Sequence, residues 1–76
     1  MSQKFPKVTA AETIKVIERV GFVLVRQSGS HMIYKNKVGK RVTIPFHDQK
    51  ILHPKVLKSI LRDAELSVEE FLKLMR

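Results

Sequence analysis

Cysteine is absent from this sequence of 76 residues, so neither a disulfide framework nor a cysteine metal site can form. Long apolar runs are also absent, and none approaches the ~20 residues that a helix needs to span a bilayer. Residues 1–6 lack the apolar core of a signal peptide, and we expect a cytoplasmic protein. The length leaves room for a single domain over residues 1–76 with one modest hydrophobic core.

Acidic residues are scarce, especially in the middle of the chain. The chain has 15 Lys and Arg but only 7 Asp and Glu, for a net charge of +8. Residues 21–62 hold nine basic side chains and one acidic one, whereas residues 63–76 hold two basic and four acidic ones. Such a field attracts a polyanion, and nucleic acid is the usual one. A solvated basic surface with no such partner is the alternative interpretation.

Capping signals mark three expected helices. Thr9–Glu12 has the spacing of a capping box ahead of a helix at about 10–20, and Gly21 is placed to end that helix. Pro54 suits the first position of a second helix, which carries an apolar stripe. Ser67–Glu70 repeats the capping-box spacing and predicts a short third helix.

Three strands are expected between the first two helices, at 22–28, 31–36 and 41–44. The order is therefore α-β-β-β-α with a short extra C-terminal helix, and the fold class is α+β. Each main helix has an apolar stripe to bury, so both are expected on one face of a three-stranded antiparallel sheet.

The turn between the first two strands fixes their register. Gly29-Ser30 has the chemistry of a two-residue type II′ turn, which places Ser28 directly opposite His31. A loop one residue longer would move His31 to the core face. The alternation of side chains then predicts a polar face and a core face. The polar face holds Phe22, Leu24, Arg26, Ser28, His31, Ile33 and Lys35, with the polar groups together near the turn, and the core face holds Val23, Val25, Gln27, Met32 and Tyr34.

The chain offers few routes to catalysis. His31, His47 and His53 are too scattered to form a recognisable metal-ligand pattern, and Asp48 is the only nearby carboxylate. There is no Ser-His-Asp signature, and the acids needed for paired-carboxylate chemistry cluster in the helical tail. What remains is a histidine in a basic setting, since imidazole can act as a general acid or base near neutral pH.

RNA would bring its own nucleophile to such a histidine. A 2′-hydroxyl that loses its proton can attack the adjacent phosphorus, and Arg or Lys can stabilise the charge that develops on the phosphoryl oxygens. Arg26, His31 and Lys35 on one face would suffice for this reaction. An exposed strand histidine with no role is the alternative.

The remaining histidines and two lysines surround the expected start of the second helix. His53 precedes Pro54, and we interpret it as ending the loop or capping the helix. His47 is interpreted as fixing the loop through hydrogen bonds to the backbone. Either becomes a second acid/base group if the loop folds over the hairpin. Lys50 and Lys55 are candidate RNA contacts, because the free N–H groups of a helix N-terminus attract phosphate.

Several stretches carry a family resemblance: Gly21-Phe22, Arg26-Gln27-Ser28-Gly29-Ser30-His31, Ile44-Pro45-Phe46-His47, Leu52 and Leu57-Lys58-Ser59-Ile60-Leu61. In this spacing they resemble the HicA-type toxins of toxin–antitoxin systems. The resemblance covers nearly the whole chain, from the first helix to the end of the second. One departure is His53-Pro54-Lys55, where many members carry a glycine, and this difference affects the expected shape of the local loop.

The resemblance implies a double-stranded-RNA-binding-like fold and the activity of a metal-independent mRNA interferase without a cofactor. It makes His31 the catalytic residue, and it implies a HicB-type antitoxin that covers the active site. We expect RNA contacts from Arg26, Ser30, Lys35, Lys50 and Lys55. Two rival interpretations are a non-catalytic RNA-binding module of the same fold and a protein whose basic face meets only an acidic protein partner.

Overall fold

The computed structural model describes residues 5–47 and 49–75, and its first helix is α1 (Ala10–Arg19). The predicted capping box is confirmed: the Thr9 hydroxyl accepts a hydrogen bond from the Glu12 N–H, and the Glu12 carboxylate accepts one from the Thr9 N–H at 2.9 Å. The helix ends in a Schellman motif, in which the Phe22 N–H donates to the Ile17 carbonyl at 3.0 Å. Gly21 supplies the positive φ, +98°, that this motif requires.

The three strands form one antiparallel sheet in the order β1 (Val23–Ser28), β2 (His31–Lys35) and β3 (Arg41–Pro45). The predicted turn register is confirmed, because Ser28 pairs directly with His31. Gly29 has a φ of +57°, whereas Ser30 has no positive φ. This combination excludes a type I′ turn and agrees with type II′.

A β-bulge in β1 corrects the predicted faces of the sheet. The register shifts between Leu24 and Arg26, so Leu24 pairs with Tyr34 and Val23 pairs with Lys35. Leu24 therefore lies on the side of buried Tyr34, and Val23 on the opposite side, the reverse of the prediction. An extra residue in a bulge reverses the alternation of the residues beyond it, which a period of two along the sequence does not show.

The expected core face of β1 was also wrong. Val23 and Val25 are 61% and 51% exposed, and every residue of β1 is exposed, because the helices pack mainly on β3. Phe22, predicted on the polar face, is instead buried. It follows the α1 C-terminus in the Schellman motif, where an apolar residue typically packs back onto the last turn of the helix.

The second and third helices, α2 (Pro54–Ala64) and α3 (Val68–Leu74), begin as predicted. The His53 ring caps α2, since its Nδ1 accepts the Lys55 N–H at 3.1 Å. Ser67 and Glu70 form the second capping box. No helix in residues 5–47 and 49–75 is long and apolar enough to cross a membrane.

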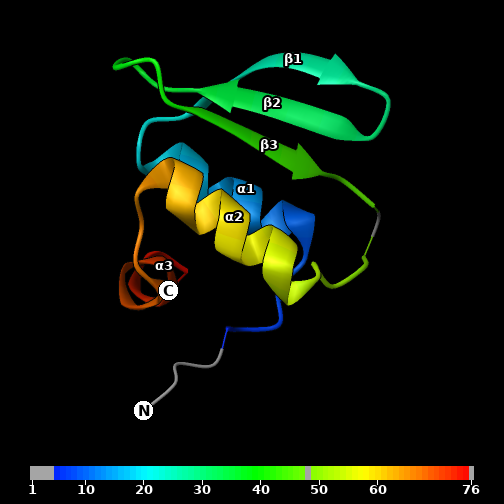
Figure 1. Cartoon of the computed structure of the whole chain (residues 1–76), viewed down its shortest axis with the longest axis vertical. Coiled ribbons are helices and arrows are strands. Elements are labelled where there is room, and N and C mark those ends of the chain that lie inside the picture. The colour runs from blue at the N-terminus through cyan, green and yellow to red at the C-terminus, as the bar shows by residue number, and fades with distance from the viewer. Residues whose placement is uncertain (1–4, 48, 76) are drawn as a thin grey trace.

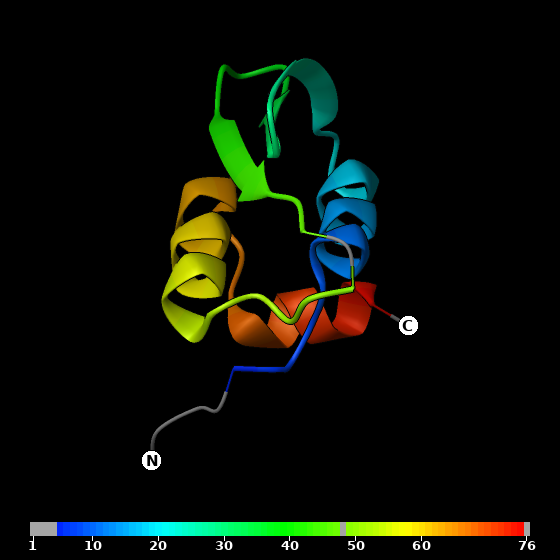
Figure 2. The same cartoon turned by 90° about the vertical axis from the view of Figure 1, so that its right-hand side faces the viewer.

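The molecule has three layers, and the core lies between them. α1 and α2 cover the same side of the sheet, and α3 lies across them on the side away from the sheet (Figures 1 and 2). The element order and the single antiparallel sheet confirm the predicted α+β class. Side chains from all three layers are buried in one cluster, among them Val16, Ile17, Tyr34, Val42, Ile44, Leu57, Ile60 and Phe71.

The long connection between β3 and α2 is tied to the N-terminal segment. The Leu52 N–H donates to the Val8 carbonyl at 2.8 Å, Thr9 and Ile51 form an isolated bridge, and the Leu52 side chain is buried. These contacts hold the connection where β3 ends and α2 begins, at the same end of the molecule as the β1–β2 turn (Figure 1).

Candidate functional site

The sheet face away from the helices, here called the outer face, carries the predicted polar residues. It consists of three rows that cross the strands. The first is Ser28–His31–Pro45, the second is Arg26–Ile33–Thr43, and the third is Val23–Lys35–Arg41. Burial alternates along β3, with Val42 and Ile44 buried toward the helices and Arg41 and Thr43 exposed on the outer face.

His31 is exposed on this face beside the turn. Among the described residues, its ring makes no hydrogen bond or ion pair, so it contributes little to the folded state. The backbone around it is well fixed. The Ser30 carbonyl accepts the Phe46 N–H at 2.6 Å, which ties the turn to the end of β3. The structure therefore presents an exposed imidazole at a strand end that is hydrogen-bonded to the end of β3.

The two outer-face cations predicted to accompany His31 lie at different distances from it. Arg26 pairs with Ile33 and is a diagonal neighbour of His31, which a long side chain can span. Lys35 is the last residue of β2, four residues from His31, roughly 13 Å at ~3.3 Å per residue. The expectation that all these groups gather near the turn is wrong for Lys35.

Arg41 is a basic residue of the outer face that the sequence analysis missed. It is exposed and pairs directly with Lys35 across the β2–β3 ladder. Like charges directly opposite one another are unfavourable, so an anion bound between them would relieve the repulsion. The sequence alone indicates that Arg41 is on the exposed face, since it alternates with the apolar residues of its strand. The β2–β3 register was needed to place it beside Lys35.

The other predicted RNA contacts lie around the end of β3 and the start of α2. Ser30 is half-buried in the turn, and Lys50 and Lys55 are exposed on either side of His53. The turn, the end of β3 and the first turn of α2 are grouped at one end of the molecule (Figure 1). The basic residues therefore extend from the outer face around this end.

The two remaining histidines have different roles in the structure. Because His53 Nδ1 accepts the Lys55 N–H, that nitrogen is unprotonated, and the neutral ring carries its hydrogen on Nε2. His53 is thus a helix cap, one of the two interpretations made from the sequence. The His47 ring is exposed and makes no hydrogen bond to a described residue, whereas its backbone carbonyl accepts the Lys50 N–H at 3.1 Å.

Metal ligation finds little support in the described residues. Within 5–47 and 49–75, no three His, Cys, Asp or Glu side chains come together in a group that could hold a metal ion. Asp48, the carboxylate named in the sequence analysis, lies outside the described residues. The outer face carries an imidazole and several cations.

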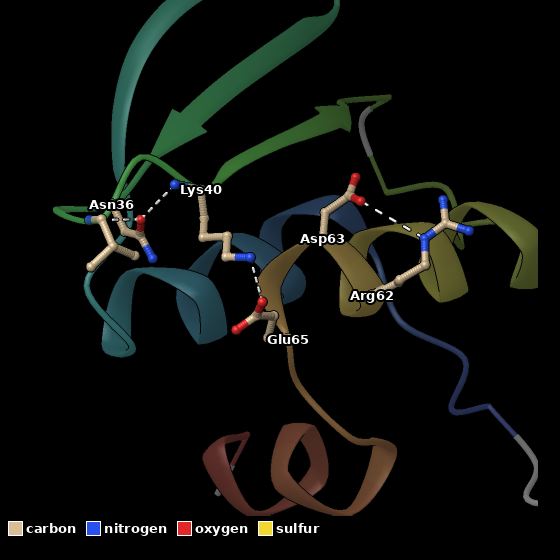
Figure 3. Close-up of polar contacts among 6 residues, drawn as sticks. Asn36, Lys40, Arg62, Asp63 and Glu65 are labelled. Atoms are coloured by element: carbon tan, nitrogen blue, oxygen red, sulfur yellow. Dashed lines mark hydrogen bonds and ion pairs between the residues drawn. The ribbon is translucent and has the colours of Figure 1, made fainter.

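Several acidic residues lie at and beyond the C-terminal end of α2. Lys40, after the β2–β3 turn, forms an ion pair with Glu65 just beyond α2. Arg62 Nε lies 3.9 Å from Asp63 Oδ1 (Figure 3). The Asn36 side chain holds the turn by accepting the Lys40 N–H at 2.8 Å. Lys40 and Arg62 are thus partly neutralised by neighbouring carboxylates.

Two shifted pKa values belong to groups with structural roles. Burial raises the pKa of the Tyr34 hydroxyl, and the charge of Glu18 adds to the effect. Hydrogen bonds from the Ser67 backbone and side chain lower the pKa of the Glu70 carboxyl in the α3 capping box. Tyr34 lies on the helix side of the sheet and Glu70 on α3, so neither belongs to the outer face.

The fold and the outer face define a class of small, basic α+β proteins with an accessible histidine at the end of a β-hairpin. The sequence matches the family model described as HicA toxin of bacterial toxin–antitoxin systems over residues 10–66, from the start of α1 to just beyond α2. This is most of the chain, and the protein belongs to the HicA toxin family. A comparison with curated proteins gives no match. Membership of a toxin–antitoxin family implies an antitoxin partner.

Proposed function

We propose that this protein is a ribonuclease toxin of the mRNA interferase type, which cleaves RNA through His31 without a metal ion. The observation that supports it best is the place of His31 in a HicA family member: exposed, at a fixed strand end, on a basic sheet face. We further propose that residues 1–76 act as one HicA-like domain in the cytoplasm and that a HicB-type antitoxin inhibits it.

His31 acts as the general base in the proposed reaction. Its ring takes the proton of an RNA 2′-hydroxyl, the 2′-oxygen forms a bond to the adjacent phosphorus, and the bond from phosphorus to the 5′-oxygen breaks. The leaving 5′-oxygen takes a proton from water. The products are a 2′,3′-cyclic phosphate and a 5′-hydroxyl. No oxidant, reductant or cofactor enters this balance.

The cations of the site contact different parts of the RNA backbone. Arg26 is close enough to His31 to stabilise the charge that develops on the phosphoryl oxygens of the reacting phosphate. Lys35 and Arg41, at the far end of the outer face, hold another phosphate along the strand. Ser30, Lys50 and Lys55 bind backbone around the turn and the start of α2.

Incubation of the purified protein with RNA in excess chelator tests this function. Cleavage should continue, and the new ends should be a 2′,3′-cyclic phosphate and a 5′-hydroxyl. RNA that is bound but remains intact under these conditions would favour a non-catalytic RNA-binding module. Cleavage that stops with chelator and returns with a divalent cation would refute the metal-independent mechanism.

Arg26→Ala and Lys35→Ala should each weaken RNA binding or turnover, with Arg26→Ala acting more strongly on turnover because of its place beside His31. Each phosphate contact releases counterions, so each substitution should also reduce the slope of affinity against salt by about one. Filter binding and cleavage at several salt concentrations measure both effects. Lys73→Ala on α3 is the matched control and should change neither. Equal losses in all three variants would argue against the outer face as the RNA site.

The antitoxin should bury His31 and carry acidic residues that face the basic outer face. Charge complementarity steers association, and the exposed apolar side chains of β1 give the partner nonpolar surface to cover. Hydrogen–deuterium exchange of the complex with a HicB-type antitoxin should therefore show protection in 28–35. If His31 is as accessible to chemical modification in the complex as in the free toxin, inhibition works by another route.

A further inference from the structure

An open pocket of about 280 Å³ lies between the end of β3 and the start of α2. One of its walls is Pro45, the cross-strand partner of His31 and the last residue of β3. The other walls come from the β3–α2 connection and the first turn of α2. The residues that line it are Pro45, His47, Lys50, Ile51, His53 and Val56, with Leu52 behind them.

The main-chain contacts around the pocket fix its shape. Leu52 is buried, and its N–H bonds to the Val8 carbonyl at 2.8 Å. The His53 ring is held as the cap of α2 by the Lys55 N–H. Pro45 is paired with His31 in the sheet. Three walls are therefore in place before any ligand binds, and such preorganisation reduces the entropic cost of binding.

The pocket combines apolar walls with polar groups at its edge. Ile51 is 54% exposed although it is a large aliphatic residue, and it belongs to no part of the core cluster. Pro45 and Val56 add apolar surface, whereas His53, Lys50 and His47 can donate or accept hydrogen bonds. A nucleobase matches this pattern, because its faces are apolar and its edges carry hydrogen-bond donors and acceptors.

We propose that this pocket holds one unpaired nucleobase of the RNA next to the phosphate at His31. The inference rests on the proposed ribonuclease function and names the subsite that positions its substrate. The volume lies just below the ~300–1,000 Å³ of typical small-molecule pockets, which suits a single base better than a whole nucleotide. His53, with its Nε2 hydrogen, offers a donor to the base edge. A base inside a duplex cannot enter, so the cleaved nucleotide must be single-stranded or displaced from its helix.

Nuclear magnetic resonance titration of the whole chain with uncleavable small ligands tests the pocket. The probes are the four common ribonucleoside monophosphates, with ribose 5-phosphate and inorganic phosphate as controls. At least one nucleotide should shift the amides of 51–53, 55 and 56 saturably, and the two controls should leave them unmoved. The same shifts with ribose 5-phosphate or phosphate would reduce the pocket to an anion site. Absence of saturable shifts in 51–56 with every nucleotide would overturn the proposal.

Two substitutions in the pocket sharpen this test. Ile51→Ala should weaken nucleotide binding about tenfold by removing an apolar wall, and it should fold normally because the side chain is exposed. His53→Asn keeps a good N-cap acceptor while it removes the ring, and it should change which base binds best. The matched control is Val38→Ala, an exposed aliphatic residue at the other end of the sheet, which should have no effect.

The results separate this proposal from the ribonuclease proposal. Pocket shifts with nucleotides, combined with RNA that stays intact both in chelator and after a divalent cation is restored, would reject the ribonuclease and keep the base site. Cleavage at the wild-type rate and at the same positions by Ile51→Ala and His53→Asn would reject the base site and keep the ribonuclease.

Discussion

Replacing His31 with alanine should lower the rate of RNA cleavage by at least ~10²–10⁴-fold, the usual contribution of one general acid or base. The protein should stay folded, because His31 is exposed and makes no hydrogen bond to a described residue. Its free energy of unfolding should change by no more than ~0.5 kcal/mol, as is typical of surface substitutions. Most RNA affinity should remain, since Arg and Lys contacts to phosphate provide it. Growth toxicity should disappear with the activity.

Thermal unfolding, RNA binding and a timed cleavage assay with chelator present measure these effects on the same preparation. His47→Ala is the comparison variant, because it removes another exposed histidine at the same end of the molecule, one that lines the pocket. Its cleavage rate should fall less than that of His31→Ala. A folded His31→Ala protein that still cleaves at a near wild-type rate would reject His31 as the catalytic residue.

Phe71→Ala should destabilise the protein by about 3–5 kcal/mol, the usual cost of removing a phenylalanine from a core. Phe71 on α3 is fully buried, although α3 lies beyond the residues that match the family model. A domain of this size has only roughly 4–11 kcal/mol of stability at ~0.05–0.15 kcal/mol per residue. The substitution therefore removes a large part of it, and the melting temperature should fall by more than 10 °C, at about 4–8 °C per kcal/mol.

Denaturant unfolding followed by circular dichroism measures this loss. Leu72→Ala is the matched control, since the neighbouring side chain is 42% exposed and its removal should cost much less. Equal midpoints for the two variants would mean that α3 does not contribute to the core as the structure indicates. A large loss for Phe71→Ala alone would show that the third helix is an integral layer of the fold.

The sequence by itself determined the local structure of this protein. Thr9 and Ser67 start their helices through capping boxes, and Gly21 ends α1, because these signals act over three or four residues. The turn at Gly29-Ser30 also follows from its own two residues, and with it the pairing of Ser28 with His31. The polar position of His31 was thus predictable, since no bulge comes between it and the turn.

Only the tertiary structure decided the features that depend on distant neighbours. The bulge at Val25 reversed the faces of the residues before it, and β1 proved to be exposed along its whole length because the helices pack mainly on β3. The pairing of Lys35 with Arg41 required the β2–β3 register. The pocket between β3 and α2 is lined by residues of both elements and of their connection, which the bond from Leu52 to the N-terminal segment holds. In each case the deciding contact joins residues from different elements, and a pattern read along one element does not contain it.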